Sequence, residues 1–211
     1  RSFRKGSMML PMFETPFVIL VLVGVAGYLL GSIPFGMVVA RMMGLGNLRD
    51  IGSGNIGATN VLRTGNKLAA FLTLVLDSGK GAIAVLIAAW MFAPDAAQTA
   101  GLLAFLGHLF PVWLGFKGGK GVATFLGIIL ALSFVAGLGA CAAWLATAVV
   151  FRYSSLAGLV AAATAPIWLY SACAPSAVAL AAALAALIWW RHKDNITRLL
   201  GGTETKIGKK G

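Results

Sequence analysis

A polar loop rich in glycine carries the first residues whose types and spacing could do chemistry. It reads RDIGSGNIGATN over residues 49–60, and Arg63 follows it. Closely spaced glycines let successive backbone N–H groups converge on an anion. Ser53 and Asn60 add short polar groups, and Arg63 adds a positive charge. The pattern predicts a phosphate site, with a flexible loop as the alternative. Its G-x-G-x-x-G spacing is no dinucleotide fingerprint, because that motif needs a preceding strand and an apolar helix is expected here.

A second glycine-rich segment, FKGGKGVAT, occupies residues 116–124 and follows a Gly107-His108 pair. If a helix begins after Lys120, its free N–H groups form an anion site. The alternative is that the two lysines only anchor the chain at a membrane surface. The segment is not a Walker A loop, because Leu114 stands where that motif needs its first glycine.

The roles of two smaller groups of polar residues stay open. Asp77 and Lys80 lie one turn apart inside an otherwise apolar stretch, where charge is costly and is either paired or functional. A structural ion pair and a direct contact with substrate are equally compatible with this spacing. For the serines of the segment RYSS at residues 152–155, helix capping is the favoured interpretation from that segment alone.

A basic segment, RHKDNITRLLGG, closes the apolar part of the chain at residues 191–202. Positions 191, 195 and 198 share one face of a helix. Binding of anionic lipid by a cationic juxtamembrane tail is the alternative, although it explains neither His192 nor Asn195.

Several familiar catalytic patterns are missing from the sequence. It contains no G-x-S-x-G elbow, no Cys or His spacing typical of a metal site, and no His followed five residues later by Asp. Cys141 and Cys173 are expected to be buried free thiols. The sequence therefore offers no obvious general base or nucleophile, and it predicts neither a metal nor a cofactor.

These polar groups must be positioned by an unusually apolar chain. Of the 211 residues, 59% are hydrophobic and 11% charged, whereas a soluble domain carries about a quarter charged residues. A membrane span needs roughly 20 apolar residues. Apart from Asp95, no charge interrupts four stretches long enough for one or two spans each, namely 15–40, 81–116, 121–151 and 153–190.

The stretches predict an all-α polytopic membrane protein with about seven helices. Residues 121–151 allow one tilted helix or two short helices meeting at Gly137 and Gly139. The hairpin is favoured because it places Lys120 and Arg152 on one side, as the bias of Lys and Arg toward cytoplasmic loops requires. The expected spans are 17–40, 68–92, 97–110, two within 121–151, and two within 153–190 broken near Pro175.

The net charge of +11 argues for phosphate or anionic lipid at one membrane face and against nucleic acid, since the basic residues sit at span ends. They predict an outside N-terminus and a cytoplasmic C-terminus. The expected organisation is an N-terminal tail over 1–16, whose residues 6–8 look like a cloning scar, one membrane domain over 17–200, and a cytoplasmic tail over 201–211. A carrier for a phosphorylated solute is the alternative function, although no internal repeat supports it.

Four motifs in order make a specific resemblance: GSIPFG at 31–36, GSGNIGATN at 52–60 with Arg63, the segment 107–124, and RHKDNITRLLGG at 191–202. The chain resembles the bacterial membrane glycerol-3-phosphate acyltransferases that use acyl phosphate as donor. The similarity covers roughly residues 17–206.

The resemblance implies acyl transfer from acyl phosphate to the sn-1 hydroxyl of glycerol 3-phosphate in phospholipid biosynthesis. It also implies seven helices, a bacterial inner-membrane location, an active site on the cytoplasmic side and, as a further partner, the peripheral enzyme that makes acyl phosphate. The implied catalytic residues are Ser53, Arg63, Lys120, Ser155, His192 and Asn195. The expected substrate-binding residues are Gly52, Gly54, Asn55, Thr59, Asn60, His108, Lys117, Gly118, Gly119 and Arg191.

Overall fold

The computed structural model describes residues 9–208, and the secondary structure within that range is entirely helical. The cloning scar predicted at residues 6–8 lies outside the described residues. The α-helices of the described part are α1 (Phe17–Gly31), α2 (Phe35–Met42), α3 (Ala58–Leu62), α4 (Lys67–Met91), α5 (Pro94–Leu109), α6 (Val122–Leu132), α7 (Phe134–Phe151), α8 (Ser154–Ser171), α9 (Val178–Arg191) and α10 (Lys193–Leu200). Short 3₁₀ turns lie at Leu48–Asp50, Val112–Leu114 and Pro175–Ala177.

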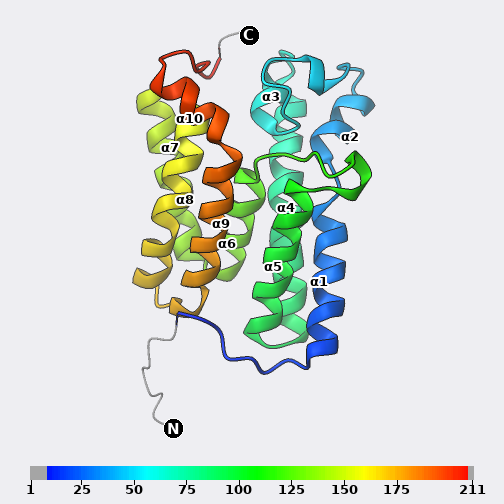
Figure 1. Cartoon of the computed structure of the whole chain (residues 1–211), viewed down its shortest axis with the longest axis vertical. Helices are drawn as coiled ribbons and strands as arrows, with labels where there is room; N and C mark the ends of the chain where they lie inside the picture. The colour runs from blue at the N-terminus through cyan, green and yellow to red at the C-terminus, as the bar shows by residue number, and fades with distance from the viewer. Residues whose placement is uncertain (1–8, 209–211) are drawn as a thin grey trace.

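The long helices run side by side along the longest axis of the molecule, and its two ends differ (Figure 1). One end carries α2, α3, α10 and the C-terminal segment, whereas residues 9–16 cross the opposite end. This crossing segment is held by the Asp95 carboxylate, which accepts hydrogen bonds from the backbone N–H groups of Glu14 and Thr15 and from the Thr15 hydroxyl. The end with α2, α3 and α10 therefore gathers the polar motifs and is called the site end below.

The expected all-α membrane architecture is confirmed. Among the described residues, five helical segments are long and apolar enough to cross a membrane: Phe17–Met42, Lys67–Met91, Pro94–Leu114, Phe134–Phe151 and Ser154–Ser171. Val122–Leu132 and Pro175–Arg191 are shorter apolar segments. Together these segments correspond to the seven spans predicted from the sequence. Which end faces the cytoplasm stays a prediction.

The first span was wrongly expected to be one helix over 17–40, because α1 ends at Gly31 and α2 begins at Phe35. Proline lacks a backbone N–H and cannot continue a helical hydrogen-bond ladder, and Pro34 precedes α2 directly. The Ile33 carbonyl next to the break accepts a hydrogen bond of 2.8 Å from Lys80 Nζ of α4. A lysine inside the membrane thus compensates for the interrupted helix.

The hairpin within 121–151 is confirmed, but it turns at Ser133 and not at the glycines proposed for the junction. Ser133 ends α6 and caps α7, its hydroxyl accepting from the Ala136 N–H. A serine at an N-cap satisfies a free backbone donor of the new helix. Gly137 instead lies within α7, where an added Cβ would collide with Leu130 of α6. The glycine serves close packing, and the serine makes the turn.

Close packing of α1 against α5 depends on glycine spacing. Of the residues of α1, all of them described, the buried ones are Gly24, Gly27 and Gly31. Cβ atoms at Gly27 and Gly31 would collide with the backbone of Ala100 and Ala104 in α5. Small residues at such spacing let two membrane helices approach closely and pack by van der Waals contact. This contact fixes the position of α5, whose C-terminal end carries His108 into the site.

Candidate active site

Asn60 organises the polar loop before α3. Gly52 and Gly54 both have positive φ angles, of 53° and 66°, which glycine adopts without steric cost. The Asn60 side chain is buried under this turn and accepts a hydrogen bond of 3.1 Å from the Ser53 backbone N–H, while its amide donates to the Leu48 carbonyl at 2.9 Å. The compact turn that results presents Ser53 at its surface. The anion-binding loop predicted from glycine spacing is thus ordered by one asparagine.

Two arginines connect the polar loops of the site end. Arg49 donates to the Gly54 carbonyl at 3.3 Å and also to the carbonyl of Lys117 in the second loop. Arg191, at the end of α9, donates to the Gly118 carbonyl at 3.2 Å and the Gly119 carbonyl at 3.3 Å. Both arginines therefore hold backbone carbonyl groups of residues 117–119 and restrict where Lys120 can lie.

The second loop also folds onto the end of α5. The backbone N–H groups of Gly118 and Gly119 donate to the Leu109 and His108 carbonyls, at 3.0 and 3.1 Å. An added Cβ at either glycine would collide with this end of α5, which explains the glycine pair sterically. Lys120, the next residue, is half-buried and donates to Asn195 Oδ1 of α10 at 2.5 Å.

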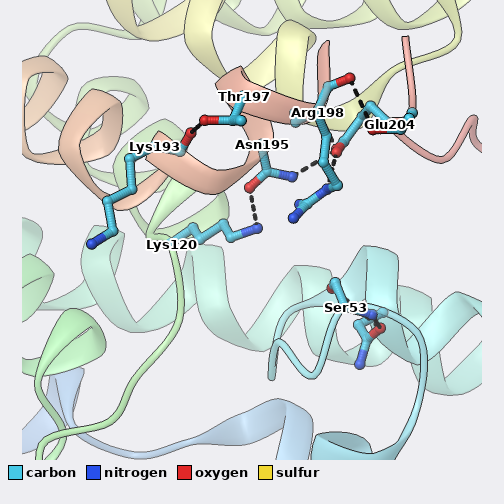
Figure 2. A network of polar contacts seen from close by, with 10 residues as sticks. Ser53, Lys120, Lys193, Asn195, Thr197, Arg198 and Glu204 are labelled. Atoms are coloured by element: carbon cyan, nitrogen blue, oxygen red, sulfur yellow. Dashed lines mark hydrogen bonds and ion pairs between the residues drawn. The ribbon is translucent and has the colours of Figure 1, made fainter. Parts of the chain in front are cut away.

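A network of polar side chains links Lys120, α10 and the C-terminal segment (Figure 2), and Ser155 of α8 joins it. Glu204 accepts through Oε1 from the Ser155 hydroxyl at 2.7 Å and from Asn195 Nδ2 at 2.6 Å. Its Oε2 accepts from Arg198 Nε at 2.7 Å. Because Asn195 also contacts Lys120, three predicted catalytic residues, Ser155, Asn195 and Lys120, belong to one connected network.

Burial changes the ionisation of two site residues. Removal from water lowers the pKa of Lys120 to about 8, although the nearby Glu204 carboxylate opposes this fall. Burial likewise lowers the pKa of His192 to about 4. His192 is therefore neutral at physiological pH. Since its Nδ1 lies 2.8 Å from the Ile188 carbonyl oxygen, Nδ1 carries the proton and Nε2 keeps a free lone pair.

The site residues surround a cavity of about 520 Å³ that combines a polar end with an apolar wall. Side chains of α4, α6 and α7 make the apolar wall, including Leu74, Leu126, Leu130 and Trp144. A smaller hollow of about 210 Å³ adjoins it and shares Ser53, Asn55 and Lys120 with it. An apolar wall beside clustered cations suits an amphiphilic anion such as a fatty acyl phosphate.

Most residues predicted for the site come together here. The larger cavity is lined by Gly52, Ser53, Asn55, Thr59, Asn60, Arg63, His108, Lys120, Ser155, His192 and Asn195. Gly54, Gly118 and Arg191 line the smaller hollow. Lys117 and Gly119 line neither space. The Lys117 side chain is exposed and Gly119 packs on the His108 ring.

Sequence reasoning did not place Arg198, Glu204 or Asp77 in the site, yet all three line the larger cavity. A signal existed for Arg198, which shares a helix face with Asn195. No local pattern marked Glu204, which lies in the segment expected to be only a tail. Asp77 pairs with Lys80 at 2.8 Å, as the interpretation of a structural ion pair expects, and it also borders the cavity, so contact with substrate stays a prediction.

The fold and cavity together define an integral membrane protein with a site for an amphiphilic anion. The model of the glycerol-3-phosphate acyltransferase family matches residues 21–202, most of the chain. The chain belongs to this family, and it is accordingly an acyltransferase.

Known relatives agree along almost the whole chain. A glycerol-3-phosphate acyltransferase of Jannaschia sp. is 64% identical, over 95% of this chain and 99% of its own. A glycerol-3-phosphate acyltransferase of Roseobacter denitrificans is 63% identical, over 94% of this chain and 100% of its own. A crystal structure of PlsY, an integral membrane glycerol 3-phosphate acyltransferase in its glycerol 3-phosphate form, is 43% identical with a TM-score of 0.85. This structure covers 90% of this chain and 96% of its own. The structure of the lysophosphatidic acid form is 41% identical with a TM-score of 0.82, and it covers 90% of this chain and 95% of its own.

Proposed function

We propose that the chain transfers a fatty acyl group from acyl phosphate to the sn-1 hydroxyl of glycerol 3-phosphate. The products are lysophosphatidic acid and inorganic phosphate. The observation that carries the proposal is the larger cavity, in which Arg63, Lys120 and Arg198 share one lining with the apolar side chains of α4, α6 and α7. The relatives described above, one of them crystallised in a glycerol 3-phosphate form, support the acceptor.

The cations have an electrostatic task in this reaction. Both substrates bring phosphate groups, which repel one another more strongly where water is excluded. Arg63 and Lys120 line the same cavity from opposite loops and supply charge-assisted hydrogen bonds to such anions. Positioning and charge compensation account for most of the catalysis we propose.

The chemical step requires no covalent enzyme intermediate. An acyl phosphate is a mixed anhydride, so the glycerol hydroxyl attacks the acyl carbonyl directly and the bond between this carbon and the phosphate oxygen breaks. A substrate phosphate oxygen takes the hydroxyl proton. His192 lines the cavity, but its pKa of about 4 makes it a weak base at neutral pH. We assign it to holding the hydroxyl by a hydrogen bond.

We assign the remaining predicted residues to binding the substrates and orienting them for the reaction. Ser53 and Asn55 border both hollows and are placed to contact a phosphate that lies between them. Thr59 shares a hydrogen bond of 2.9 Å with Ser154 across the site end. We keep Ser155 and Asn195 as catalytic residues, since both face the cavity beside Lys120.

Donor choice tests the function. Purified protein is incubated with radiolabelled glycerol 3-phosphate and either palmitoyl phosphate or palmitoyl-CoA, and lysophosphatidic acid is quantified. We expect product from palmitoyl phosphate alone. Equal turnover with palmitoyl-CoA would overturn the proposed donor, and no product from either donor would overturn the function.

We further propose that the site end faces the cytoplasm of a bacterial inner membrane. Among the described residues, basic residues outside the spans belong to elements of this end, for example Arg63 at the end of α3 and Lys193 in α10, as the positive-inside bias requires. A cytoplasmic peripheral enzyme that makes acyl phosphate could then deliver this reactive donor directly. Cysteine-accessibility labelling of residues 111–121 in intact cells checks the orientation, and labelling from outside would contradict it.

A further inference from the structure

The C-terminal segment after α10 folds back over the junction of α7 and α8. Its Ile207 N–H donates to the Arg152 carbonyl at 2.7 Å, and Arg152 donates in return to the Ile207 carbonyl at 3.4 Å. Lys206 lies over the Tyr153 ring, 5.7 Å from its centroid. These contacts fix the segment just after Glu204, whose side chain is 7% exposed and borders the cavity.

The Glu204 carboxylate is surrounded by donors from two elements. Ser155 belongs to α8, whereas Asn195 and Arg198 belong to α10. Each of these side chains lines the same cavity. One carboxylate therefore sets the direction of three polar side chains that face the reacting groups.

We propose that Glu204 is a positioning residue for the acyl transfer, which acts by fixing Asn195, Ser155 and Arg198 around Lys120. The inference rests on the proposed function and extends it, because the C-terminal segment becomes part of the catalytic unit. The segment was expected to be only a tail.

The asparagine amide shows why the carboxylate matters. An amide has one accepting end and one donating end. Because Glu204 can only accept, it binds the NH₂ end of Asn195, which turns Oδ1 toward the Lys120 ammonium group. Without the carboxylate, nothing holds the NH₂ end of the amide, and rotation of the amide can bring its NH₂ group against Lys120, donor against donor. Glu204 therefore controls the position of Lys120 through Asn195.

Glu204 is not the missing general base. Burial alone would raise the pKa of Glu204, but hydrogen bonds from Ser155, Asn195 and Arg198 outweigh it and lower the pKa below its ordinary value. A carboxylate whose lone pairs are taken by three donors binds a proton weakly. Its effect on the reaction must pass through the side chains it holds.

The charge of Glu204 also acts on Lys120. Among the charged groups near Lys120, Glu204 and Asp194 raise its pKa, whereas Arg198 and Arg191 lower it. His192 is neutral, and from the opposite loop Arg63 lines the larger cavity and Arg49 lines the smaller hollow. Removal of the Glu204 charge leaves an excess of cations and lowers the pKa of Lys120 further. If activity requires protonated Lys120, the alkaline limb of the pH–rate profile then moves to lower pH.

The test compares Glu204→Gln and Glu204→Asp with the wild type. Glutamine preserves the shape but turns an NH₂ group toward Arg198 or Asn195, whereas aspartate keeps the charge on a shorter side chain. Asp50→Asn is the matched control, since it removes an exposed carboxylate of the same end from outside both hollows. We measure kcat, KM and the pH–rate profile of each purified variant with palmitoyl phosphate.

Glu204→Gln should lower kcat by about 10- to 100-fold, the size expected when a hydrogen bond to a charged group is lost, and move the alkaline limb to lower pH. Glu204→Asp should keep the wild-type alkaline limb and recover part of kcat, and Asp50→Asn should match the wild type.

A Glu204→Gln variant with unchanged kcat and an unchanged alkaline limb overturns the inference. Should Glu204→Gln fail to fold, a displaced alkaline limb in Glu204→Asp overturns the inference instead. Absence of product from the wild type and from Asp50→Asn refutes the proposed function itself.

Discussion

Two polar clusters of this molecule each combine a lysine with a carboxylate, and their roles differ. In the first, called the buried cluster, Lys80 of α4 contacts Asp77 at 2.8 Å and His108 Nδ1 lies 3.7 Å from the same carboxylate oxygen. In the second, called the site cluster, Lys120 reaches Glu204 only through Asn195. The buried cluster lies within membrane spans, and the site cluster lies on loops, α10 and the C-terminal segment.

The difference lies in what each lysine has left to bind. The Lys80 side chain is 1% exposed, and its ammonium group is taken by Asp77 and the Ile33 carbonyl. A charge buried in this way needs partners from the protein. Lys120 donates to one neutral amide and borders two hollows. Lys80 therefore stabilises a helix break, whereas the ammonium group of Lys120 borders the hollows in which we propose that the substrates bind.

Removing Lys80 should have the largest effect on stability. Lys80→Ala leaves Asp77 buried without its cation and the Ile33 carbonyl without its donor. We expect a loss of about 3–5 kcal/mol in the free energy of unfolding, measured by chemical denaturation in detergent. Molecules that remain folded should keep most of their rate.

The control for Lys80 replaces both charges. The double variant Asp77→Leu with Lys80→Met replaces the buried ion pair with apolar side chains and should recover much of the lost stability. A Lys80→Ala protein as stable as the wild type but inactive would contradict the comparison, because Lys80 would then contact substrate.

Removing a site cation should affect activity instead. Lys120→Ala and Arg63→Ala should each lower kcat/KM by about 100- to 1000-fold, as the loss of one preorganised group that stabilises developing charge does. Unfolding curves should stay close to that of the wild type. Kinetics of purified, monodisperse variants check both statements.

Conservative replacements sharpen the result. Lys120→Arg should retain more activity than Lys120→Ala if the lysine acts mainly through its charge. Arg63→Lys should recover only part, because a point charge does not replace a planar fork of donors. Near-wild-type kinetics for both alanine variants would disprove the assignment of the site.

The smallest effect concerns pH. With a pKa of about 8, Lys120 loses its proton as the pH rises through that value, so kcat/KM should fall on the alkaline side. His192 gains a proton only as the pH falls through about 4, and it should cause no fall between pH 5 and pH 7. A wild-type profile that is flat to pH 10 would show that the charge of Lys120 is dispensable.

The spans could be predicted from the sequence because apolar length is a local property. The interruptions were harder, since they depend on single residues and their partners. Pro34 breaks the first span where Lys80, far along the chain, can bind the freed carbonyl. Ser133 turns the hairpin because it caps α7, whereas the more conspicuous Gly137 serves packing.

The site also combines features that the local sequence predicts with features that depend on contacts between distant segments. The loops around Ser53 and Lys120 could be predicted because glycine and cations concentrate there within a few residues. Glu204 could not, because only folding of the C-terminal segment over Arg152 brings it to Ser155. Contacts between distant segments leave no periodic signal in a single sequence.

The most direct measurement of the central claim follows both products of one reaction. Purified wild type is given glycerol 3-phosphate and palmitoyl phosphate, and lysophosphatidic acid and inorganic phosphate are quantified together, with Lys120→Ala in parallel. We expect equal amounts of the two products from the wild type and the loss of both in the variant. Release of phosphate without lysophosphatidic acid, or full activity of Lys120→Ala, would contradict it.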